Sequence, residues 1–254
     1  MNKKKCFQFK IFSQKSGILH YVSTKYFGNM SLYTATDIQK VIENRKNLAQ
    51  ELNIDLNNFV FQQQVHGAKC SIVESKDKAK GVYSYASALN DNDAMITATK
   101  GVCITVMAGD CVPLLFFDTQ NKVIAAAHAG WRGTYKKIAQ KTVEKMTQRF
   151  NSKPKYIIAG IGPSISAPHY EVDDLVYNEF KKHIPGYNKF FSEGKEKGKY
   201  YLDLWAANKA QLLSAGLKEA NIEISALCTY ADNHLFFSAR RGEEERFTAG
   251  IMLL

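Results

Sequence analysis

Residues 101–134 constrain the fold of this chain more than any other stretch, because they hold three apolar runs in close succession. The stretch reads GVCITVMAGDCVPLLFFDTQNKVIAAAHAGWRGT, and the runs lie at residues 102–107, 112–117 and 123–127. Each run has the length of a strand, is rich in Val, Ile and Phe, and is bounded by turn residues. Short apolar runs of this kind predict three buried strands.

The polar residues of this stretch stand at the ends of the runs. Asp110 and Cys111 follow the first run, and His128 closes the third. Glycines at positions 130 and 133 allow the backbone to turn tightly after His128, and Thr134 can then cap a helix. This arrangement predicts buried strands that deliver polar side chains to a site.

The rest of the chain alternates between strand and helix patterns. We expect an opening hairpin at residues 7–26 and strands at 58–65, 70–74, 156–161, 222–228, 236–241 and 248–254. Helices are expected from a cap at Thr36 or Asp37 to Leu52, at 135–150, and after caps at Asp173 and Asp203. Residues 185–199 are expected to form a mobile surface loop. This mixture favours an α/β or α+β fold with mixed sheets, and we predict a layered α/β/β/α sandwich. No linker interrupts residues 1–254, so we expect a single domain.

Charge and cysteine content narrow the class of protein. The net charge is +10 and the pI is about 9.2, which fits either an anionic partner or a solvated Lys-rich surface. No basic run is interleaved with aromatic residues, as a nucleic-acid groove requires. Residues 1–10 begin like the basic part of a signal peptide, but no apolar segment follows, and no window reaches transmembrane length. The five cysteines are scattered and odd in number. We therefore expect a cytoplasmic protein, a monomer or homodimer, that binds neither nucleic acid nor membranes.

Three residues at the ends of apolar runs are candidate metal ligands: His66, Cys111 and His128. Imidazole and thiolate are the ligands that zinc prefers, and three protein ligands leave one coordination position open for catalysis. The three residues lie far apart in the sequence, so only the fold can bring them together. The alternative is that Cys111 is a small core residue and that each histidine has an ordinary structural role.

Other polar residues near this group have a structural and a functional interpretation each. Asp110 either shapes a turn or, beside Cys111, orients a metal-bound water or a ligand histidine and so takes part in catalysis. Arg132 either forms a surface ion pair or binds phosphate or carboxylate through its planar guanidinium. Arg45 and Arg240 are further candidates for substrate binding. The remaining polar candidates are Asp93, Arg241 and Arg246.

Several motifs occur in a characteristic order along the chain. They are QVHG (64–67), DAMIT (93–97), GDCVPLLFFD (109–118), AAAHAGWRGT (125–134), GIGPSIS with YEV (160–172), DLWAANKAQL (203–212), CT (228–229) and FFSARR with a later Arg (236–246). In these motifs, from about residue 16 onward, the chain resembles the laccase-domain, or polyphenol-oxidase-like, family related to bacterial YfiH.

The resemblance implies a zinc site at His66, Cys111 and His128, and an α/β/β/α fold grouped with cysteine-hydrolase-like proteins. It also implies purine nucleoside phosphorylase activity on adenosine, inosine and methylthioadenosine, with adenosine deaminase activity. Older descriptions of the family name multicopper polyphenol oxidases, and some members are described as peptidoglycan editing factors. The chain departs from the family at residues 167–169, which read Ala-Pro-His where members often carry Cys.

Four functional hypotheses follow. The first is zinc-dependent purine nucleoside chemistry, in which Arg132, with Arg45 or Arg240, binds phosphate. The second is copper-dependent phenol oxidation, against which the six histidines argue because no two form an HxH pair. The third is a metal-free hydrolase with Cys111 as nucleophile and His128 as base, suited to peptidoglycan editing. The fourth is a non-catalytic binding protein.

Overall fold

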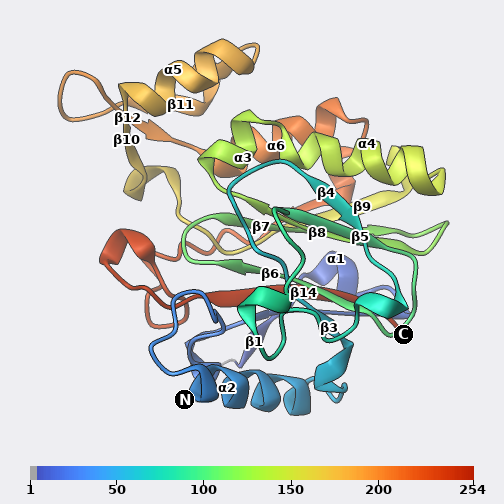
Figure 1. Cartoon of the computed structure of the whole chain (residues 1–254). Helices are drawn as coiled ribbons and strands as arrows, with labels where there is room; N and C mark the ends of the chain where they lie inside the picture. Colours follow the sequence, from blue (N-terminus) through green and yellow to red (C-terminus); the bar gives the residue numbers. More distant parts are fainter. Residues whose placement is uncertain (1–4) are drawn as a thin grey trace.

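The computed structural model describes residues 5–254, so the first four residues of the basic N-terminal segment lie outside the description. Two mixed sheets pack face to face, and helices cover the outer face of each (Figure 1). The order of the layers is helix, sheet, sheet, helix, so the predicted α/β/β/α sandwich is confirmed. Among the described residues, no helix combines the length and the apolar character needed to cross a membrane.

Within residues 5–254, the first sheet has the strand order β1-β2-β14-β6-β3. The bounds of its strands are Cys6–Phe7 (β1), Ile18–Ser23 (β2), Phe247–Leu253 (β14), Cys103–Ala108 (β6) and Phe59–Val60 (β3). β14 pairs antiparallel with both β2 and β6, whereas β3 runs parallel to β6. The C-terminal strand therefore lies next to the strand that leads to Cys111.

The second sheet has the order β13-β9-β7-β8-β5-β4 within the described part of the chain. The bounds of its strands are Ile222–Ile224 (β13), Ile157–Ile161 (β9), Val112–Asp118 (β7), Val123–Ala129 (β8), Ala94–Thr97 (β5) and Cys70–Ile72 (β4). β7 and β8 form an antiparallel hairpin at its centre. Every residue of these two strands is buried, which explains why residues 112–117 and 123–127 each form a continuous apolar run.

Alternate side chains of the central hairpin serve two separate cores. Leu115 and Phe117 of β7 face the first sheet, where they pack with Ile104 and Ile251. Leu114 and its alternate neighbours face the helices α4 and α6. The bounds of the helices are Lys10–Ser13 (α1), Ile38–Glu51 (α2), Trp131–Tyr135 (α3), Ile138–Phe150 (α4), Asp174–His183 (α5) and Leu204–Ser214 (α6). On the other side of the molecule, α2 covers the first sheet (Figure 1).

Several predicted helices and the last predicted strand are confirmed, and the helices have the predicted residues at their ends. The carboxylates of Asp37, Asp173 and Asp203 each accept a hydrogen bond from a backbone N–H in the first turn of the helix that follows. Gly216, with φ of +93°, lies just after the end of α6, where a left-handed residue ends a helix. β14 coincides with the predicted last strand to within one residue.

Other expectations are wrong. The opening hairpin is interrupted by α1, because Phe9 and Phe12 turn inward to fill the space between the sheets. The predicted strand at 58–65 ends at Val60, and the strand at 222–228 ends at Ile224. Residues 236–241 form no strand: Phe236 and Phe237 are buried in the core and a 3-10 turn, Ala239–Arg241, follows.

The segment predicted as a mobile loop at 185–199 instead contributes to a small third sheet. Its described strands follow the order β10-β12-β11, with bounds Glu171–Asp173 (β10), Lys199–Leu202 (β12) and Phe191–Glu193 (β11). Phe190 is buried and anchors this unit against the main body. Together with α5, the small sheet projects from one end of the sandwich (Figure 1).

Candidate metal centre

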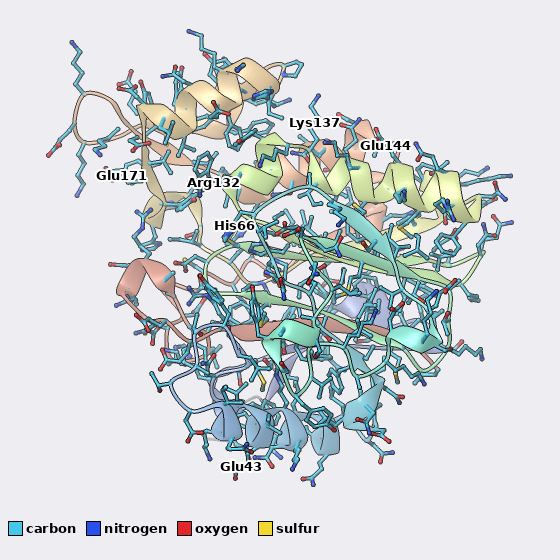
Figure 2. All side chains as sticks on the ribbon, in the orientation of Figure 1. Glu43, His66, Arg132, Lys137, Glu144 and Glu171 are labelled. Atoms are coloured by element: carbon cyan, nitrogen blue, oxygen red, sulfur yellow. The ribbon has the colours of Figure 1, made fainter. Side chains whose placement is uncertain are left out.

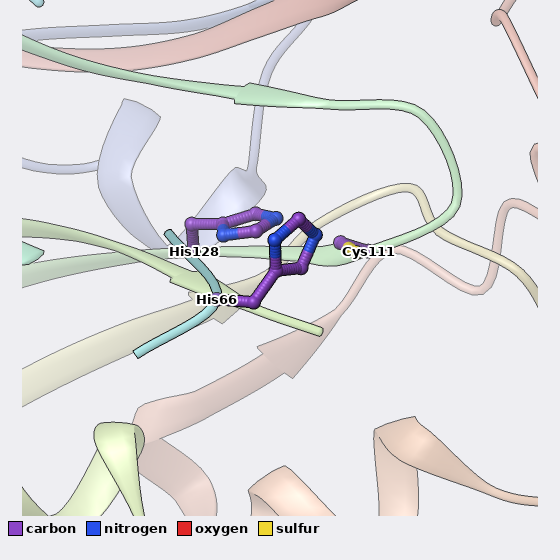
Figure 3. A group of neighbouring side chains, drawn as sticks. All are labelled: His66, Cys111 and His128. Carbon is purple, nitrogen blue, oxygen red and sulfur yellow. The ribbon is translucent and has the colours of Figure 1, made fainter. Parts of the chain in front are cut away.

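The three predicted ligand residues meet at one end of the sandwich. His66 lies beyond β3, Cys111 lies in the turn between β6 and β7, and His128 is the penultimate residue of β8. One potential ligand atom from each residue lies within 4.8 Å of the other two. The three side chains point toward one another (Figure 3). The predicted convergence of these residues is confirmed.

His66 is held in place by its own backbone. The residue adopts a left-handed conformation, with φ of +56°. The N–H groups of Val65, His66 and Gly67 all donate to the carboxylate of Asp93, at 3.3, 3.1 and 2.6 Å. One carboxylate therefore gathers three consecutive amides and fixes the turn that presents the His66 ring.

Asp93 also orients His128. Its Oδ1 lies 2.9 Å from His128 Nδ1, and its backbone carbonyl accepts the His128 N–H at 2.7 Å. Because Nδ1 is engaged by the carboxylate, Nε2 is the nitrogen that remains available as a ligand. Asp93 is completely buried. It is thus the carboxylate that connects both histidines of the cluster.

The sequence left two roles open for Asp110, shaping a turn or orienting a group at the metal site, and its contacts are those of the first. Asp110 Oδ1 accepts a hydrogen bond from the Thr229 hydroxyl at 2.6 Å, and Oδ2 accepts the Arg240 N–H at 2.7 Å. Asp110 adopts φ of +90°, in the tight turn before Cys111. Its side chain therefore ties this turn to two C-terminal loops, while Asp93 binds the histidine.

The electrostatics of the cluster favour a thiolate. Burial opposes ionisation of Cys111, but the adjacent His128 and His66 outweigh it and lower the pKa of the thiol to about 6. Burial likewise disfavours the charged form of His128, yet the Cys111 thiolate and Asp93 raise the pKa of its imidazole to about 10. A thiolate is the form of cysteine that binds metals and attacks electrophiles.

A glycine makes room for the sulfur. A Cβ atom placed on Gly130 would lie 2.8 Å from Cys111 Sγ and 3.3 Å from the His66 ring. Gly130 has φ of −70°, which any residue can adopt. The size of the side chain at position 130 is therefore limited by the space that the cluster occupies and not by backbone conformation.

The cluster opens into a cavity of about 220 Å³. Besides the three residues, its lining includes Tyr33, Tyr85, Gln64 and Arg246. Arg246 Nη1 donates to the carbonyl groups of Glu243 and Glu245, while Nε and Nη2 have no partner among residues 5–254. The sequence had marked Arg246 only as one of several polar candidates, and the cavity gives it a position beside the cluster.

Two of the arginines predicted to bind substrate, Arg132 and Arg240, do not line this cavity. Arg132 is exposed, and its guanidinium stacks on the Trp131 ring at 4.2 Å but forms no hydrogen bond or ion pair with the described residues. It is the second residue of α3 and is labelled in Figure 2. Arg240 Nη2 donates to the carbonyl of Glu171, and its guanidinium lies 5.2 Å from the Tyr170 ring. A second cavity of about 240 Å³ contains Arg240 and Tyr170.

The third predicted arginine, Arg45, does not reach the cavity. Its guanidinium is buried and donates to the carbonyl groups of Met30, Gly81 and Val82, at 2.6 to 3.0 Å. It also stacks on the Phe61 ring at 3.8 Å. With its donors engaged by backbone carbonyls, Arg45 supports the surrounding loops and offers no free cation to a substrate.

Comparison with known proteins places the chain in one family. Residues 11–254 match the family model described as multi-copper polyphenol oxidoreductase laccase, and the chain belongs to this laccase-like family. Purine nucleoside phosphorylase YlmD of Bacillus subtilis (strain 168) is 36% identical over 215 residues, which cover 85% of this chain and 77% of the relative. Adenosine deaminase RL5, from an unknown prokaryotic organism, is 36% identical over 213 residues, which cover 84% and 81%. The crystal structure of YlmD from Geobacillus stearothermophilus matches with a TM-score of 0.91 at 33% identity, over 96% of this chain and 94% of that one. The relatives are named for enzyme activities, and this chain is an enzyme of the same family.

The donor atoms of the cluster fit a metal ion. Two imidazole nitrogens and a thiolate form a ligand set that suits zinc or copper. Asp93 accepts the hydrogen bond that a ligand histidine usually donates from its second ring nitrogen. Gly130 leaves the space beside the sulfur clear. His66, Cys111 and His128 are thus the residues that would hold the ion.

Proposed function

We propose that this chain is a zinc-dependent purine nucleoside phosphorylase that acts on adenosine, inosine and methylthioadenosine and also deaminates adenosine. The observation that carries the proposal is the convergence of His66, Cys111 and His128 on a cavity, in a chain whose relatives are named for these two activities. Zinc is favoured over copper because a three-residue site with one open position is the usual arrangement of catalytic zinc.

The residues around the site have distinct tasks in this proposal. A zinc ion held there would supply Lewis-acid catalysis by polarising an atom of the bound nucleoside. Asp93 holds His128 in one tautomer and His66 in one orientation, and so keeps the ligand geometry fixed. Asp110 is a positioning residue, since its carboxylate fixes the turn that carries Cys111.

Phosphate requires a cation, and three arginines are the candidates. Arg246 lines the same cavity as the cluster and has two guanidinium nitrogens without a described partner. Arg132 and Arg240 lie on the Tyr170 side of the site, where the Arg132 guanidinium is unpaired among the described residues. Replacing each arginine in turn by Gln identifies the one that binds phosphate, because loss of a phosphate contact raises the KM for phosphate more than the KM for the nucleoside.

Phenol oxidation by several copper ions is less well supported, even though the family description names it. Such an enzyme needs many imidazoles around additional copper ions. Among residues 5–254, the cluster described above is the one group of three potential ligands that lie close together. One cluster matches a single ion.

The test is a metal-quantified assay of inosine and adenosine with phosphate, with and without a chelator. His66→Ala, Cys111→Ala and His128→Ala are each expected to lose bound zinc and to lower nucleoside turnover by roughly 100-fold or more while staying folded. Cys70→Ala is the matched control, because its thiol lies outside the cluster near Thr142. Unchanged zinc content in all three cluster variants would overturn the site.

A second candidate is a metal-free hydrolase, favoured by one observation. Cys111, His128 and Asp93 lie in the order of a nucleophile, a base and an orienting carboxylate, and the pKa of the Cys111 thiol is lowered to about 6. In that case activity would survive chelation and the His66→Ala change, and would be lost after thiol alkylation. Loss of activity on chelation, restored by added zinc, would favour the phosphorylase.

A further inference from the structure

Two tyrosines stand at the mouth of the cavity that contains the metal cluster. Tyr33 belongs to the loop before α2, and Tyr85 begins a 3-10 turn, Tyr85–Ser87. Their ring centroids lie 5.3 Å apart with an angle of 42° between the planes. Both line the same cavity as His66, Cys111 and His128. A pair of aromatic rings therefore faces the space that a ligand of the cluster would occupy.

The two rings differ in how they are held. Tyr85 is half-buried and packs against Leu32, Val41 and Ile42 beside α2. Tyr33 is 73% exposed, an unusual degree for so large an aromatic side chain. Neither phenol oxygen has a hydrogen-bond partner anywhere in residues 5–254. The pair thus combines a fixed ring with an open one, and both hydroxyl groups remain available to a ligand.

Both tyrosine loops are fastened to one buried cation. Arg45 donates twice to the carbonyl of Met30, three residues before Tyr33, and once to that of Val82, three residues before Tyr85. It donates also to the carbonyl of Gly81. The Tyr85 carbonyl is held in addition by Gln63, at 3.0 Å. The spacing of the two rings is therefore set by a built network and not by chance contact at the surface.

We propose that Tyr33 and Tyr85 form an aromatic platform that stacks on the base of the nucleoside, and that Arg45 is the residue that positions it. The inference rests on the proposed function, because that function supplies a planar heterocyclic base. Stacking suits a family of nucleosides, since every base offers a flat face and the contact does not depend on its substituents. With the base on the platform, the nucleoside lies in the cavity that His66, Cys111, His128 and Arg246 also line.

Running the reaction toward nucleoside synthesis tests the platform, because the base and ribose-1-phosphate are then separate substrates. In the zinc-loaded enzyme, Tyr33→Leu and Tyr85→Leu are expected to raise the KM for hypoxanthine about tenfold and to leave the KM for ribose-1-phosphate unchanged. Tyr33→Phe and Tyr85→Phe keep the ring and should stay close to wild type. Arg45→Lys should raise the same KM as the Leu variants do. Tyr83→Leu is the matched control, because Tyr83 lies two residues from Tyr85 but outside the cavity.

The outcomes separate this inference from the proposed function. If the wild-type enzyme turns over nucleosides and the Leu variants keep their KM for hypoxanthine, the platform is overturned and the function stands. If the wild-type enzyme shows no turnover, calorimetric binding of hypoxanthine and of catechol to the zinc-loaded protein decides. If hypoxanthine binds to the wild type and not to the Tyr33→Leu, Tyr85→Leu double variant, the platform is supported although the proposed phosphorylase activity is not. Absence of hypoxanthine binding, or binding of catechol alone, overturns the platform.

Discussion

The absence of a side chain at Gly130 leaves the space that the Cys111 sulfur and the His66 ring occupy. A methyl group there would meet Cys111 Sγ at 2.8 Å, although alanine can adopt the backbone conformation of this residue. We expect Gly130→Ala to displace the sulfur or the His66 ring and to weaken metal binding by about 10-fold or more, with a loss of stability of only about 1 kcal/mol. Chelator competition measures the first quantity and urea unfolding the second.

Gly186→Ala is the opposite case and serves as the control. Gly186 has φ of +65° and no atom within 4 Å of the added methyl group, so the change strains the backbone and touches nothing. It should lower the free energy of unfolding by about 1 kcal/mol and leave metal affinity as it is. Equal metal affinity in Gly130→Ala and wild type would contradict the steric argument.

Among single residues, the sequence indicated the three members of the cluster better than the residues that support them. His66, Cys111 and His128 stand at the ends of apolar runs, which is visible in the sequence. The role of Asp93 depends on the pairing of β5 with β8, where Ala94 lies opposite Ala127 and Asp93 thereby reaches His128. The register of distant strands is not encoded in local spacing. Arg45 was misjudged for the same reason, because only the fold shows which carbonyl groups surround it.

At the scale of elements, the break between α3 and α4 is the clearest departure from the predicted helix at 135–150. The carbonyl of Thr134 accepts a hydrogen bond from the Gln211 side chain of α6 at 2.7 Å and one from the N–H of Lys137, three residues on, at 2.9 Å. Lys137 then takes a left-handed conformation, with φ of +64°. A tertiary contact with a residue 77 positions away thus ends the helical turn, and local periodicity carries no trace of it.

The left-handed lysine leads to a stability prediction. Lys137→Gly should raise the free energy of unfolding by about 0.5–1 kcal/mol, because glycine adopts positive φ without a steric penalty. Lys141→Gly, at an exposed position inside α4, should lower it by about 0.5–1 kcal/mol. Chemical denaturation of the two variants checks the pair. The same sign for both would show that Lys137 is not strained.

At the scale of the whole molecule, the N-terminal segment joins the two sheets through a buried histidine. His20 of β2 accepts the Phe9 N–H at Nε2, at 2.9 Å, and Phe9 and Phe12 fill the space between the sheets. At the far side of this segment, Glu223 accepts the N–H groups of Lys10 and Ile11. Burial, only partly offset by the backbone of Phe9, lowers the pKa of His20 to about 4.

Acid should therefore loosen this junction. Between about pH 6.5 and pH 4, the unfolded chain binds a proton at His20 that the folded chain does not, so stability rises with pH across this window and falls as pH decreases. The contribution lost by pH 4 is on the order of 3 kcal/mol. His20→Gln should flatten the pH dependence of urea unfolding by that amount, whereas His234→Gln, at an exposed site, should not. Identical slopes for His20→Gln and wild type would refute the linkage.

The mixture of mixed sheets and helices was predictable from apolar periodicity and the alternation of elements. The order of the layers is not fixed by these patterns, and it was the family resemblance that implied it. The third small sheet was missed because its strands are only three or four residues long, and the sequence around them is rich in Gly and Lys. Val172, Phe190 and Leu202 are the residues that bury this unit against the main body. That residues 1–254 form one domain, in the cytoplasm, as a monomer or homodimer, stays a prediction.

The placement of the three donor residues has a consequence for how the protein matures. His66 follows a strand of one sheet, whereas Cys111 and His128 flank strands of the other, so the donors assemble only after both sheets have closed. A nascent polypeptide emerging from the ribosome has no such coordination sphere. An ion bound by these three residues would therefore enter only after the two sheets have packed, and the ions available at that stage would decide which metal occupies the cluster.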